Sequence, residues 1–259
     1  MDLTGTRIVV TGVASGIGKA TATHLMALGA HVIGVDLRPS DVPDTHLVAD
    51  LSDPSQIDDV VAHLDPGANG LCNVAGLPPS APAETVLALN AKGLERLTVR
   101  LAPKLADDAS IVNIASSAGI GWAGRLDSLR AFDAVPFELE ALRAFAMEHE
   151  LLEEGASYFF SKEFVVTWTM RNRWRWRDRG IRVNSVSPGP VDTPALSDFV
   201  ATLGRARRIM ELMDRPGRPE EIAPVIAFLL SDSSGWIRGT NVAVDGGMTS
   251  HLAMDAAGW

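Results

Sequence analysis

A tyrosine and a lysine stand four residues apart in this sequence of 259 residues, at a spacing that suits proton transfer. Tyr158 is the single tyrosine of the chain, and Lys162 is one of four lysines. Residues at positions i and i+4 share one face of a helix, so the ammonium can lie beside the phenol and favour its ionised form. Lowering a phenol pKa from about 10 to about 7 requires roughly 4 kcal/mol, more than a partly solvated lysine supplies alone. The pair is a candidate general acid/base, and the alternative is a tyrosine that only packs at the start of a helix.

Two serines, Ser116 and Ser117, directly follow the apolar run of residues 110–115. If that run is a strand of a parallel sheet, a hydroxyl at its carboxyl end projects toward the crevice where ligands bind. Near Tyr158, Ser116 could hydrogen-bond a substrate oxygen and polarise a carbonyl. Such a serine pair is also ordinary in loops, so the expectation depends on Tyr158 lying nearby.

A glycine-rich turn, TGVASGIG at residues 11–18, comes between an apolar run and a helical pattern. Its glycines Gly12, Gly16 and Gly18 would let the backbone approach a pyrophosphate, with a helix N-terminus facing the negative charge. The alternative is a tight loop with no ligand. Asp36 follows Gly18 by 18 residues, close to the spacing at which an acidic residue accepts hydrogen bonds from an adenosine ribose. A carboxylate there would repel a 2′-phosphate, so NAD is favoured over NADP despite the nearby Arg38.

Short apolar runs alternate with helical patterns along the chain. The pattern predicts an α/β fold, a single-domain, Rossmann-type doubly wound parallel sheet of about seven strands spanning residues 1–259. The expected strands are residues 7–10, 31–35, 46–49, 70–74, 110–115, 181–186 and 241–244. The expected helices are residues 19–28, 54–64, 84–105, 159–179 and 219–231.

Two stretches depart from this alternation. Residues 122–157 form an insertion far longer than an ordinary connection of about 2–6 residues, and residues 137–154 are rich in helix formers, with Gly155 expected to end that helix. Residues 194–214 are expected to act as a substrate lid. The lid's apolar residues are Phe199, Val200, Leu203, Met210 and Met213, and the expected pocket walls are Trp122 and residues 77–79.

Composition excludes several classes of function. A formal net charge of −9 and a pI near 5.1 disfavour nucleic acid and anionic membranes as partners. Residues 171–179 mix arginine with tryptophan, but alternate positions of a helix lie about 200° apart and make no single basic face.

No metal site is expected, because the six histidines lack paired spacing. Cys72 cannot form an internal disulfide, and the start lacks signal-peptide features, so a cytoplasmic location is expected.

In this order the motifs resemble the short-chain dehydrogenase/reductase family over essentially the whole chain. The matching motifs are the TGxxxGxG turn at residues 11–18, Asp50 with Leu51, a variant of the NNAG stretch at residues 72–76, Asn90, Ser116, the YxxxK pair, and Pro188 with Gly189, Val191 and Thr193. Cys72 and Val74 depart from the family's NNAG pattern. The resemblance implies that Tyr158 is the general acid/base and that Lys162 binds the nicotinamide ribose and lowers the pKa of the tyrosine. It further implies that Ser116 orients the substrate oxygen and that Asn90 completes a proton relay. The implied cofactor contacts are Gly12, Ser15, Gly16, Ile17, Gly18, Asp36, Asp50, Leu51, Asn73, Ala75, Gly76, Tyr158, Lys162, Pro188, Gly189, Val191 and Thr193.

The long insertion resembles that of two subgroups of the family, which act on coniferyl-type alcohols or on 3α-hydroxysteroids and other carbonyl compounds. The resemblance is greater for the first, so the expected activity is NAD-dependent hydride transfer between nicotinamide and an apolar, aromatic alcohol or aldehyde. The alternatives are a 3α-hydroxysteroid dehydrogenase/carbonyl reductase and an NAD-binding sensor or scaffold without catalysis. The resemblance also implies a homo-oligomer, with a dimer favoured. Residues 122–157 and 248–259 are candidates for subunit contact or for cover over the active site.

Overall fold

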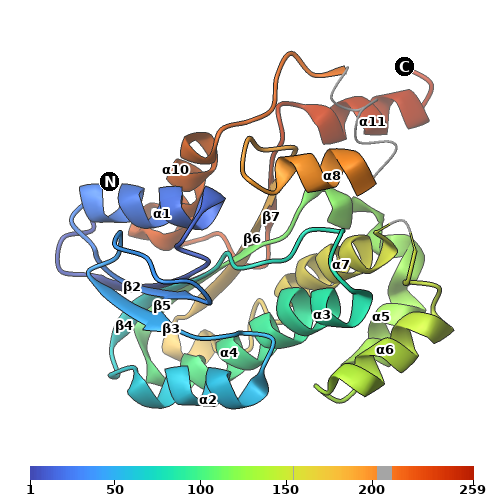
Figure 1. The fold of residues 1–259 in the computed structure, drawn as a ribbon. Helices are drawn as coiled ribbons and strands as arrows, with labels where there is room; N and C mark the ends of the chain where they lie inside the picture. The colour runs from blue at the N-terminus through green and yellow to red at the C-terminus, as the bar shows by residue number, and fades with distance from the viewer. Residues whose placement is uncertain (154, 203–211) are drawn as a thin grey trace.

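Seven parallel strands form the central sheet in the order β3-β2-β1-β4-β5-β6-β7 (Figure 1). This computed structural model describes the chain except residue 154 and residues 203–211. The strands are β1 (Arg7–Thr11), β2 (His31–Asp36), β3 (Thr45–Val48), β4 (Ala68–Asn73), β5 (Leu105–Ile114), β6 (Arg182–Pro188) and β7 (Asn241–Val244). Because β1 pairs with β2 on one side and β4 on the other, the strand order reverses beside β1, where such sheets bind ligands. The predicted doubly wound sheet is confirmed.

Helices cover both faces of the sheet. Helices α1 and α10 pack together on one face, and α2, α4 and α7 cover the other (Figure 1). The α-helices are α1 (Gly16–Ala27), α2 (Pro54–His63), α3 (Ala83–Leu87), α4 (Leu94–Leu101), α5 (Leu126–Asp133), α6 (Leu139–Glu148), α7 (Ala156–Arg171), α8 (Leu196–Thr202), α10 (Pro219–Leu230) and α11 (Met248–Ala256). The helix expected over residues 84–105 is divided, because a π-helical turn, Ala88–Gly93, lies between α3 and α4 and a 3-10 turn, Ala102–Lys104, follows.

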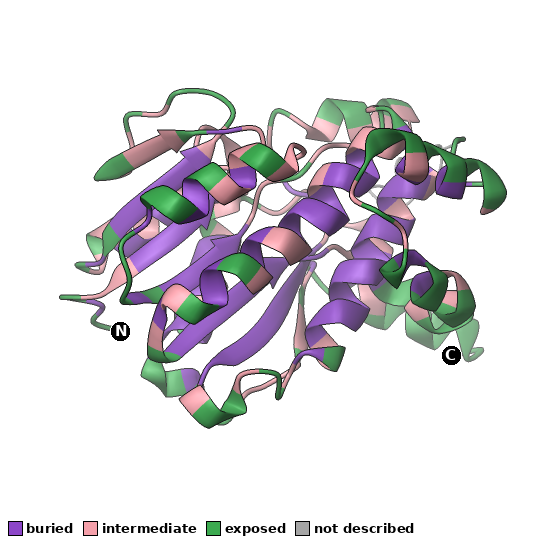
Figure 2. Ribbon diagram, turned by 90° about the horizontal axis from the view of Figure 1, so that it is seen from below, coloured by how far each residue is buried: buried purple, intermediate pink, exposed green. Residues whose placement is uncertain are grey.

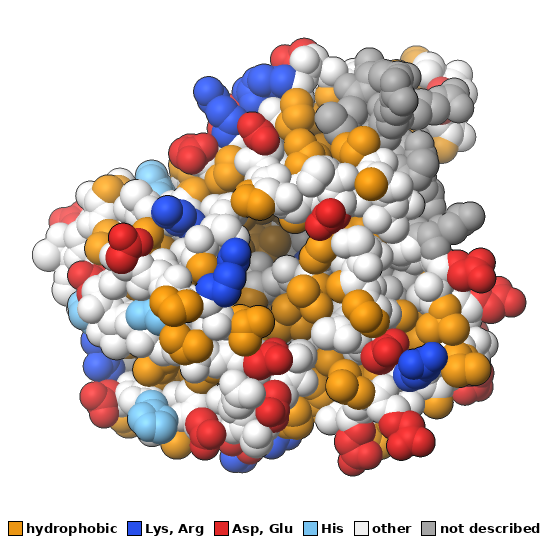
Figure 3. All heavy atoms as spheres, in the orientation of Figure 1, with side chains coloured by type: hydrophobic (Ala, Val, Ile, Leu, Met, Phe, Trp, Pro, Cys, Tyr) orange, Lys and Arg blue, Asp and Glu red, His pale blue; other side chains and the backbone are white. Residues whose placement is uncertain are grey.

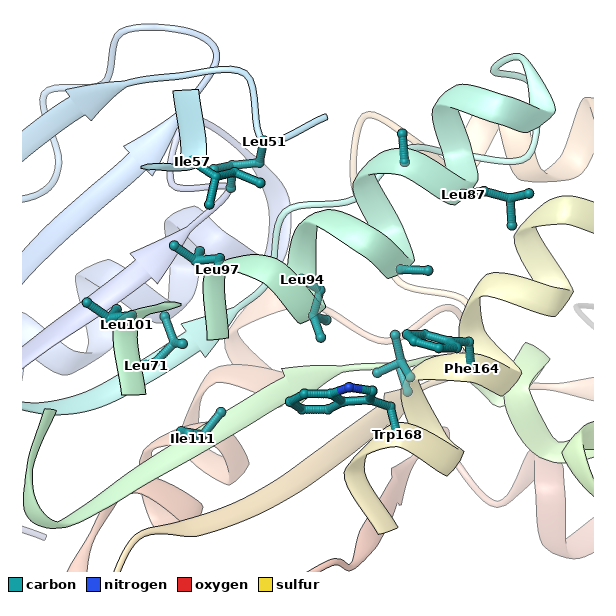
Figure 4. Packing of buried hydrophobic residues seen from close by; sticks show 14 of the residues in the cluster. Leu51, Ile57, Leu71, Leu87, Leu94, Leu97, Leu101, Ile111, Phe164 and Trp168 are labelled. Carbon is teal, nitrogen blue, oxygen red and sulfur yellow. The ribbon is translucent and has the colours of Figure 1, made fainter. Parts of the chain in front are cut away.

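Burial explains why the strands read as near-continuous apolar runs. Both faces of the sheet are covered, so successive side chains are buried whichever way they point along β6, along β5 from Ala109 onward and along β1 after Arg7 (Figure 2). The apolar core on the side of α2, α4 and α7 includes Ile57, Leu97 and Trp168 (Figure 4). A second core between the sheet and helices α1 and α10 includes Ile8, Leu25 and Ile226.

The insertion folds as a 3-10 segment, Ser117–Arg125, followed by α5 and α6. The predicted helical insertion is confirmed, but the helix expected over residues 137–154 is shorter and does not end at Gly155. Helix α6 ends at Glu148 in a Schellman motif, with Glu150 at φ 55°, and the N–H of buried Leu151 donates to the Ala146 carbonyl at 2.8 Å. Gly155, at φ 70°, instead precedes the first residue of α7.

Aromatic side chains pack the insertion onto α7. The fully buried ring of Phe132 on α5 lies 5.0 Å from the ring of Phe145 and 5.3 and 5.2 Å from the rings of Phe160 and Phe164 on α7. The buried ammonium of Lys92 lies over the Phe132 ring and donates a hydrogen bond to the Phe132 carbonyl at 2.9 Å. The insertion is therefore part of the core that supports α7.

The helix predicted over residues 159–179 is also too long. Helix α7 ends at Arg171, because the side-chain amide of Asn172 donates to the Trp168 carbonyl at 2.8 Å and caps the helix end. The following residues form turns and a 3-10 helix, Arg177–Arg179, so the arginines do not continue the last helical turn. Among the described helices, none is both long and apolar enough to span a bilayer.

Candidate active site

The carboxyl ends of the strands open into a cleft of about 1140 Å³. Figure 3 shows this face hollowed near its middle, with hydrophobic side chains around the hollow. Most of the site residues expected from the sequence line the cleft. They are Gly12, Ser15, Gly16, Ile17, Gly18, Asp36, Asp50, Leu51, Ala75, Gly76, Ser116, Tyr158, Lys162, Pro188, Gly189, Val191 and Thr193. Two others, Asn73 and Asn90, do not line it.

The glycine turn is built by close backbone approach. Gly12 has φ 76°, and a Cβ at this position would lie 2.9 Å from the Cα of Ala75, at the end of β4. A Cβ at Gly18 would lie 2.0 Å from the Gly12 carbonyl oxygen, so only glycine lets α1 begin this close to β1. The N-terminus of α1 thus faces the cleft without side chains in the way, as an anion site requires.

The segment after β6 closes over the same turn. A Cβ at Gly189 would lie 3.0 Å from the Cα of Asp245, so glycine lets this segment pass the end of β7. Farther along, the methyl group of Thr193 would lie 3.2 Å from a Cβ on Gly16. Pro188, Gly189 and Thr193 therefore form the wall that faces the glycine turn.

Asp36 stands at the end of β2 beside the glycine turn. One oxygen of its carboxylate accepts a hydrogen bond from the Ala14 N–H at 3.0 Å, and the other accepts from the Arg38 N–H at 2.9 Å. The Arg38 guanidinium donates to the Ser15 hydroxyl at 2.9 Å. The carboxylate of Asp50 is held within its own loop, where it accepts from the N–H and hydroxyl of Ser52. Asp36 is thus the acid placed to meet a ribose beyond the turn.

Tyr158, Lys162 and Ser116 meet at the inner end of the cleft. The Lys162 ammonium lies 5.6 Å from the centre of the Tyr158 ring and donates to the Ile114 carbonyl at 3.0 Å. Burial raises the pKa of Tyr158 to about 12, although a hydrogen bond with Ser116 opposes the rise. Burial likewise lowers the pKa of Lys162 to about 8. In the protein alone burial outweighs the Ser116 hydrogen bond, and the phenol pKa stays well above its ordinary value.

The Ser116 hydroxyl is held by the turn that follows β5. It caps the 3-10 segment of the insertion by accepting from the Ala118 N–H at 3.1 Å. Its own carbonyl accepts a hydrogen bond from the Ser187 hydroxyl on β6 at 3.0 Å. This arrangement fixes Ser116 beside Tyr158, where the two hydroxyls can hold one substrate oxygen.

The two asparagines lie behind the cleft wall with different contacts. Asn90, in the π-helical turn, accepts from the Leu77 N–H at 2.8 Å and donates to the Leu77 carbonyl at 3.1 Å. It therefore fixes the segment next to Gly76, where a Cβ would lie 3.7 Å from the Lys162 ammonium. The side chain of Asn73 instead points into the interior and donates to Thr98 and Asn113, both at 2.8 Å. The side chain of Asn73 therefore points away from the cleft, which leaves its backbone for the expected cofactor contact.

The substrate end of the cleft differs in part from the sequence-based expectation. Leu77 and Pro78 line it as expected, but Trp122 packs against the core and does not line the cleft. On α8, the Phe199 ring lies edge-on to the Tyr158 ring at 4.9 Å, and Val200 also lines the cleft. Leu203 and Met210 lie outside the described residues. The methyl end of Met213 would lie 3.1 Å from a Cβ on Gly246, and Met213 does not line the cleft.

Further lining residues were not singled out from the sequence. Met248 and Leu252 on α11, within the segment considered as possible cover, close one side, while Arg125 and Glu163 place an ion pair on another, with 3.2 Å between Nε and Oε2. Among these residues, only Glu163 carried a sequence signal, because it directly follows Lys162. The others come from segments whose placement depends on tertiary packing.

Comparisons with known proteins agree with this geometry. Residues 6–125 match the family model described as short chain dehydrogenase, and residues 143–249 match the model described as Enoyl-(Acyl carrier protein) reductase. Coniferyl-alcohol dehydrogenase of a Pseudomonas species is 39% identical, over 96% of this chain and 99% of that protein. The 3-alpha-hydroxysteroid dehydrogenase/carbonyl reductase of Comamonas testosteroni is 30% identical, over 93% of this chain and 95% of that protein.

A solved structure shows the same architecture. The 3-alpha-hydroxysteroid dehydrogenase of Pseudomonas sp. B-0831, crystallised with NADH, superposes with a TM-score of 0.83 at 32% identity. The alignment covers 95% of this chain and 98% of that one. Fold, cleft and sequence likeness agree over nearly the full length, and the chain belongs to the short-chain dehydrogenase/reductase family of oxidoreductases.

Proposed function

We propose that this protein is an NAD-dependent alcohol dehydrogenase that oxidises an aromatic, coniferyl-type alcohol and reduces the matching aldehyde. The observation that carries the proposal is the meeting of Ser116, Tyr158 and Lys162 at the inner end of a cleft that begins at a glycine turn. The cleft fits a dinucleotide, since the glycine turn and the first residues of α1 line it where a pyrophosphate would be held, and Asp36 lines it where an adenosine ribose would follow. Bound NAD supplies the hydride acceptor.

Each side chain has a distinct role in the proposed reaction. Tyr158 takes the hydroxyl proton of the alcohol, and its phenolate is favoured by the Lys162 ammonium together with the positive charge of oxidised nicotinamide. Ser116 donates a hydrogen bond to the substrate oxygen and holds the carbinol carbon in place. Asn90 is a positioning residue, because its amide fixes the Leu77 backbone next to Gly76 and Lys162.

The aromatic substrate is supported by the walls of the cleft. Phe199 stands edge-on to Tyr158, and Leu77, Ile120 and Leu252 add apolar surface around it. The 39% identity to a coniferyl-alcohol dehydrogenase supports the same choice. A second candidate is a 3α-hydroxysteroid, favoured by the structural likeness to the NADH-bound steroid dehydrogenase. A sensor without catalysis has no need of a phenol placed beside a serine and a lysine.

A rate assay with three alcohols tests the substrate. The growth of the reduced-nicotinamide absorbance band is followed with NAD and with coniferyl alcohol, benzyl alcohol or a 3α-hydroxysteroid. We expect the highest kcat/KM with coniferyl alcohol. Turnover of the steroid alone would keep the chemistry and contradict the aromatic substrate, and dinucleotide binding without turnover of any alcohol would favour the sensor.

Replacing Asp36 with alanine tests the choice of NAD over NADP. Hydrogen bonds from ribose hydroxyls to a carboxylate contribute about 1.5–3 kcal/mol, so we expect kcat/KM with NAD to fall roughly 10–100-fold. The ratio of NADP to NAD activity should rise, since the repulsion of a 2′-phosphate is removed and Arg38 is free to bind it. Asp41→Ala, an exposed acid outside the cleft, is the control. Equal losses of kcat/KM with NAD and with NADP would contradict the proposed role of Asp36 in selecting NAD.

The pH dependence of the two directions tests the role of Tyr158. The oxidation rate should rise with pH up to the apparent pKa of the phenol, because the ionised form takes the proton. The reduction rate should stay level over the same interval, because it needs the neutral phenol, and without the charge of oxidised nicotinamide burial keeps the pKa of Tyr158 at about 12. Steady-state rates of oxidation and of reduction, measured from about pH 6 to about pH 10, would show the two pH dependences. Flat profiles in both directions would exclude Tyr158 as the titrating group.

We propose a cytoplasmic homodimer in which the insertion contributes to the interface. Leu126, Leu139, Met147 and Leu152 on the insertion are between 38% and 60% exposed, so the insertion offers apolar side chains to a second copy. Light scattering should give twice the 27.6 kDa of one chain. A mass of 27.6 kDa at micromolar concentration would contradict the dimer.

A further inference from the structure

A buried carboxylate lies in the cleft apart from the reacting groups. Glu163 follows Lys162 on α7, is 5% exposed, and lines the cleft. Its Oε2 has no hydrogen-bond donor among the described residues, and Arg125 Nε lies 3.2 Å away in an ion pair. Because burying a carboxylate is costly unless hydrogen bonds satisfy it, Glu163 is placed where a further donor would be favourable.

The insertion packs closely over one oxygen of this carboxylate and leaves the other without a donor. Its 3-10 segment passes over Oε1 at Gly121, where a Cβ would lie 2.8 Å away, while Oε2 is buried and unpaired. Arg125 also lines the cleft, and its side chain is 40% exposed. Burial raises the pKa of Glu163, and Arg125 opposes the rise.

The charges select the kind of group that can bind here. Arg125 already balances the charge of Glu163, so a cationic ligand is not required. Glu150, Glu153 and Asp198 also line the cleft, so a carboxylate ligand would be repelled. A neutral hydroxyl satisfies both conditions, because its O–H donates to Glu163 while its oxygen, or a neighbouring ether oxygen, accepts from Arg125.

Glu163 and Tyr158 both line the cleft, from different faces of α7. Five residues separate them, a helical rise of about 7.5 Å with a rotation of about 140°, so a ligand that reaches both must be longer than this rise and carry an oxygen at each end. We propose that Glu163, paired with Arg125, binds the phenolic hydroxyl of a 4-hydroxycinnamyl alcohol while Tyr158 acts on the carbinol oxygen. This inference rests on the proposed function and narrows its substrate class to phenol-bearing aromatic alcohols. Glu163 is thus a specificity-determining residue rather than a catalytic one.

Two alcohols that differ by one hydroxyl test the inference. The ratio of kcat/KM for 4-hydroxycinnamyl alcohol to that for cinnamyl alcohol, both with NAD, should be about 10–100 in the wild type, as expected for a hydrogen bond to a charged group. In Glu163→Gln the ratio should fall about tenfold, because a neutral amide is a weaker acceptor. Arg130→Gln, which breaks an exposed ion pair on α5 outside the cleft, is the matched control and should keep the wild-type ratio.

The outcomes separate this inference from the proposed function. If the wild-type protein oxidised the two alcohols with a kcat/KM ratio near one, the inference would be overturned while the proposed dehydrogenase function would stand. This measurement does not depend on the folding of any variant. Equal losses on both alcohols in Glu163→Gln, with the ratio unchanged, would show a structural role only and overturn it too. Failure of the wild type to oxidise either alcohol would overturn the proposed function itself.

Discussion

Replacing Tyr158 with phenylalanine is expected to lower kcat for alcohol oxidation by about 10²–10⁴-fold while NAD affinity stays within about threefold of the wild type. The substitution removes only the hydroxyl, the atom proposed to take the substrate proton. The ring keeps its edge-on contact with Phe199 and its place beside Lys162, so the fold and the cofactor cleft are preserved.

Turnover would be measured as the amount of coniferaldehyde formed at fixed reaction times. NAD affinity would be measured by the quenching of tryptophan fluorescence on titration with NAD. A loss of turnover accompanied by an equal loss of NAD affinity would assign Tyr158 to cofactor binding instead. Retained turnover would show that another group takes the proton.

Replacing Phe132 with alanine should lower the free energy of unfolding by about 3–5 kcal/mol. The ring is fully buried between α6 and α7, where it contacts Phe145, Phe160 and Phe164 and lies under the Lys92 ammonium. Removing the ring would abolish these contacts and leave a cavity, so Tm should fall by about 6–20 °C.

The control for Phe132 is Phe228→Ala on α10, where the phenylalanine is 36% exposed and its removal should cost far less. Thermal unfolding of the two variants, followed by far-ultraviolet circular dichroism, gives the comparison. Equal Tm values for the two variants would mean that the insertion does not support α7.

The strands and the cofactor turn could be predicted because their causes are local. A parallel sheet buried on both faces demands continuous apolar runs, and the close approach at Gly12 and Gly18 demands glycine. The pairing of Tyr158 with Lys162 needs only helical spacing. These residues predict the sheet and the position of the cleft, and they supply the proposed reacting groups.

Features that depend on distant packing could not be predicted in this way. The Schellman motif at Glu150 ended α6 earlier than Gly155 suggested, and the packing of Trp122 on the core removed it from the cleft wall. Asn73 turned inward because Thr98 and Asn113 offered it partners from two other elements. The ion pair of Glu163 with Arg125 depends on how the insertion folds back over α7, which sequence spacing does not reveal.

The most direct test of the proposed hydride transfer follows deuterium from the carbinol carbon of the alcohol to the nicotinamide. The protein is incubated with NAD and coniferyl alcohol carrying deuterium at both positions of the carbinol carbon, and the nicotinamide product is analysed by mass spectrometry. If hydride passes directly from the carbinol carbon beside Tyr158, each NADH formed carries one deuterium and the coniferaldehyde keeps the other. Unlabelled NADH, or the absence of NADH under conditions where the protein is folded, would contradict the assignment of this cleft as an alcohol dehydrogenase site.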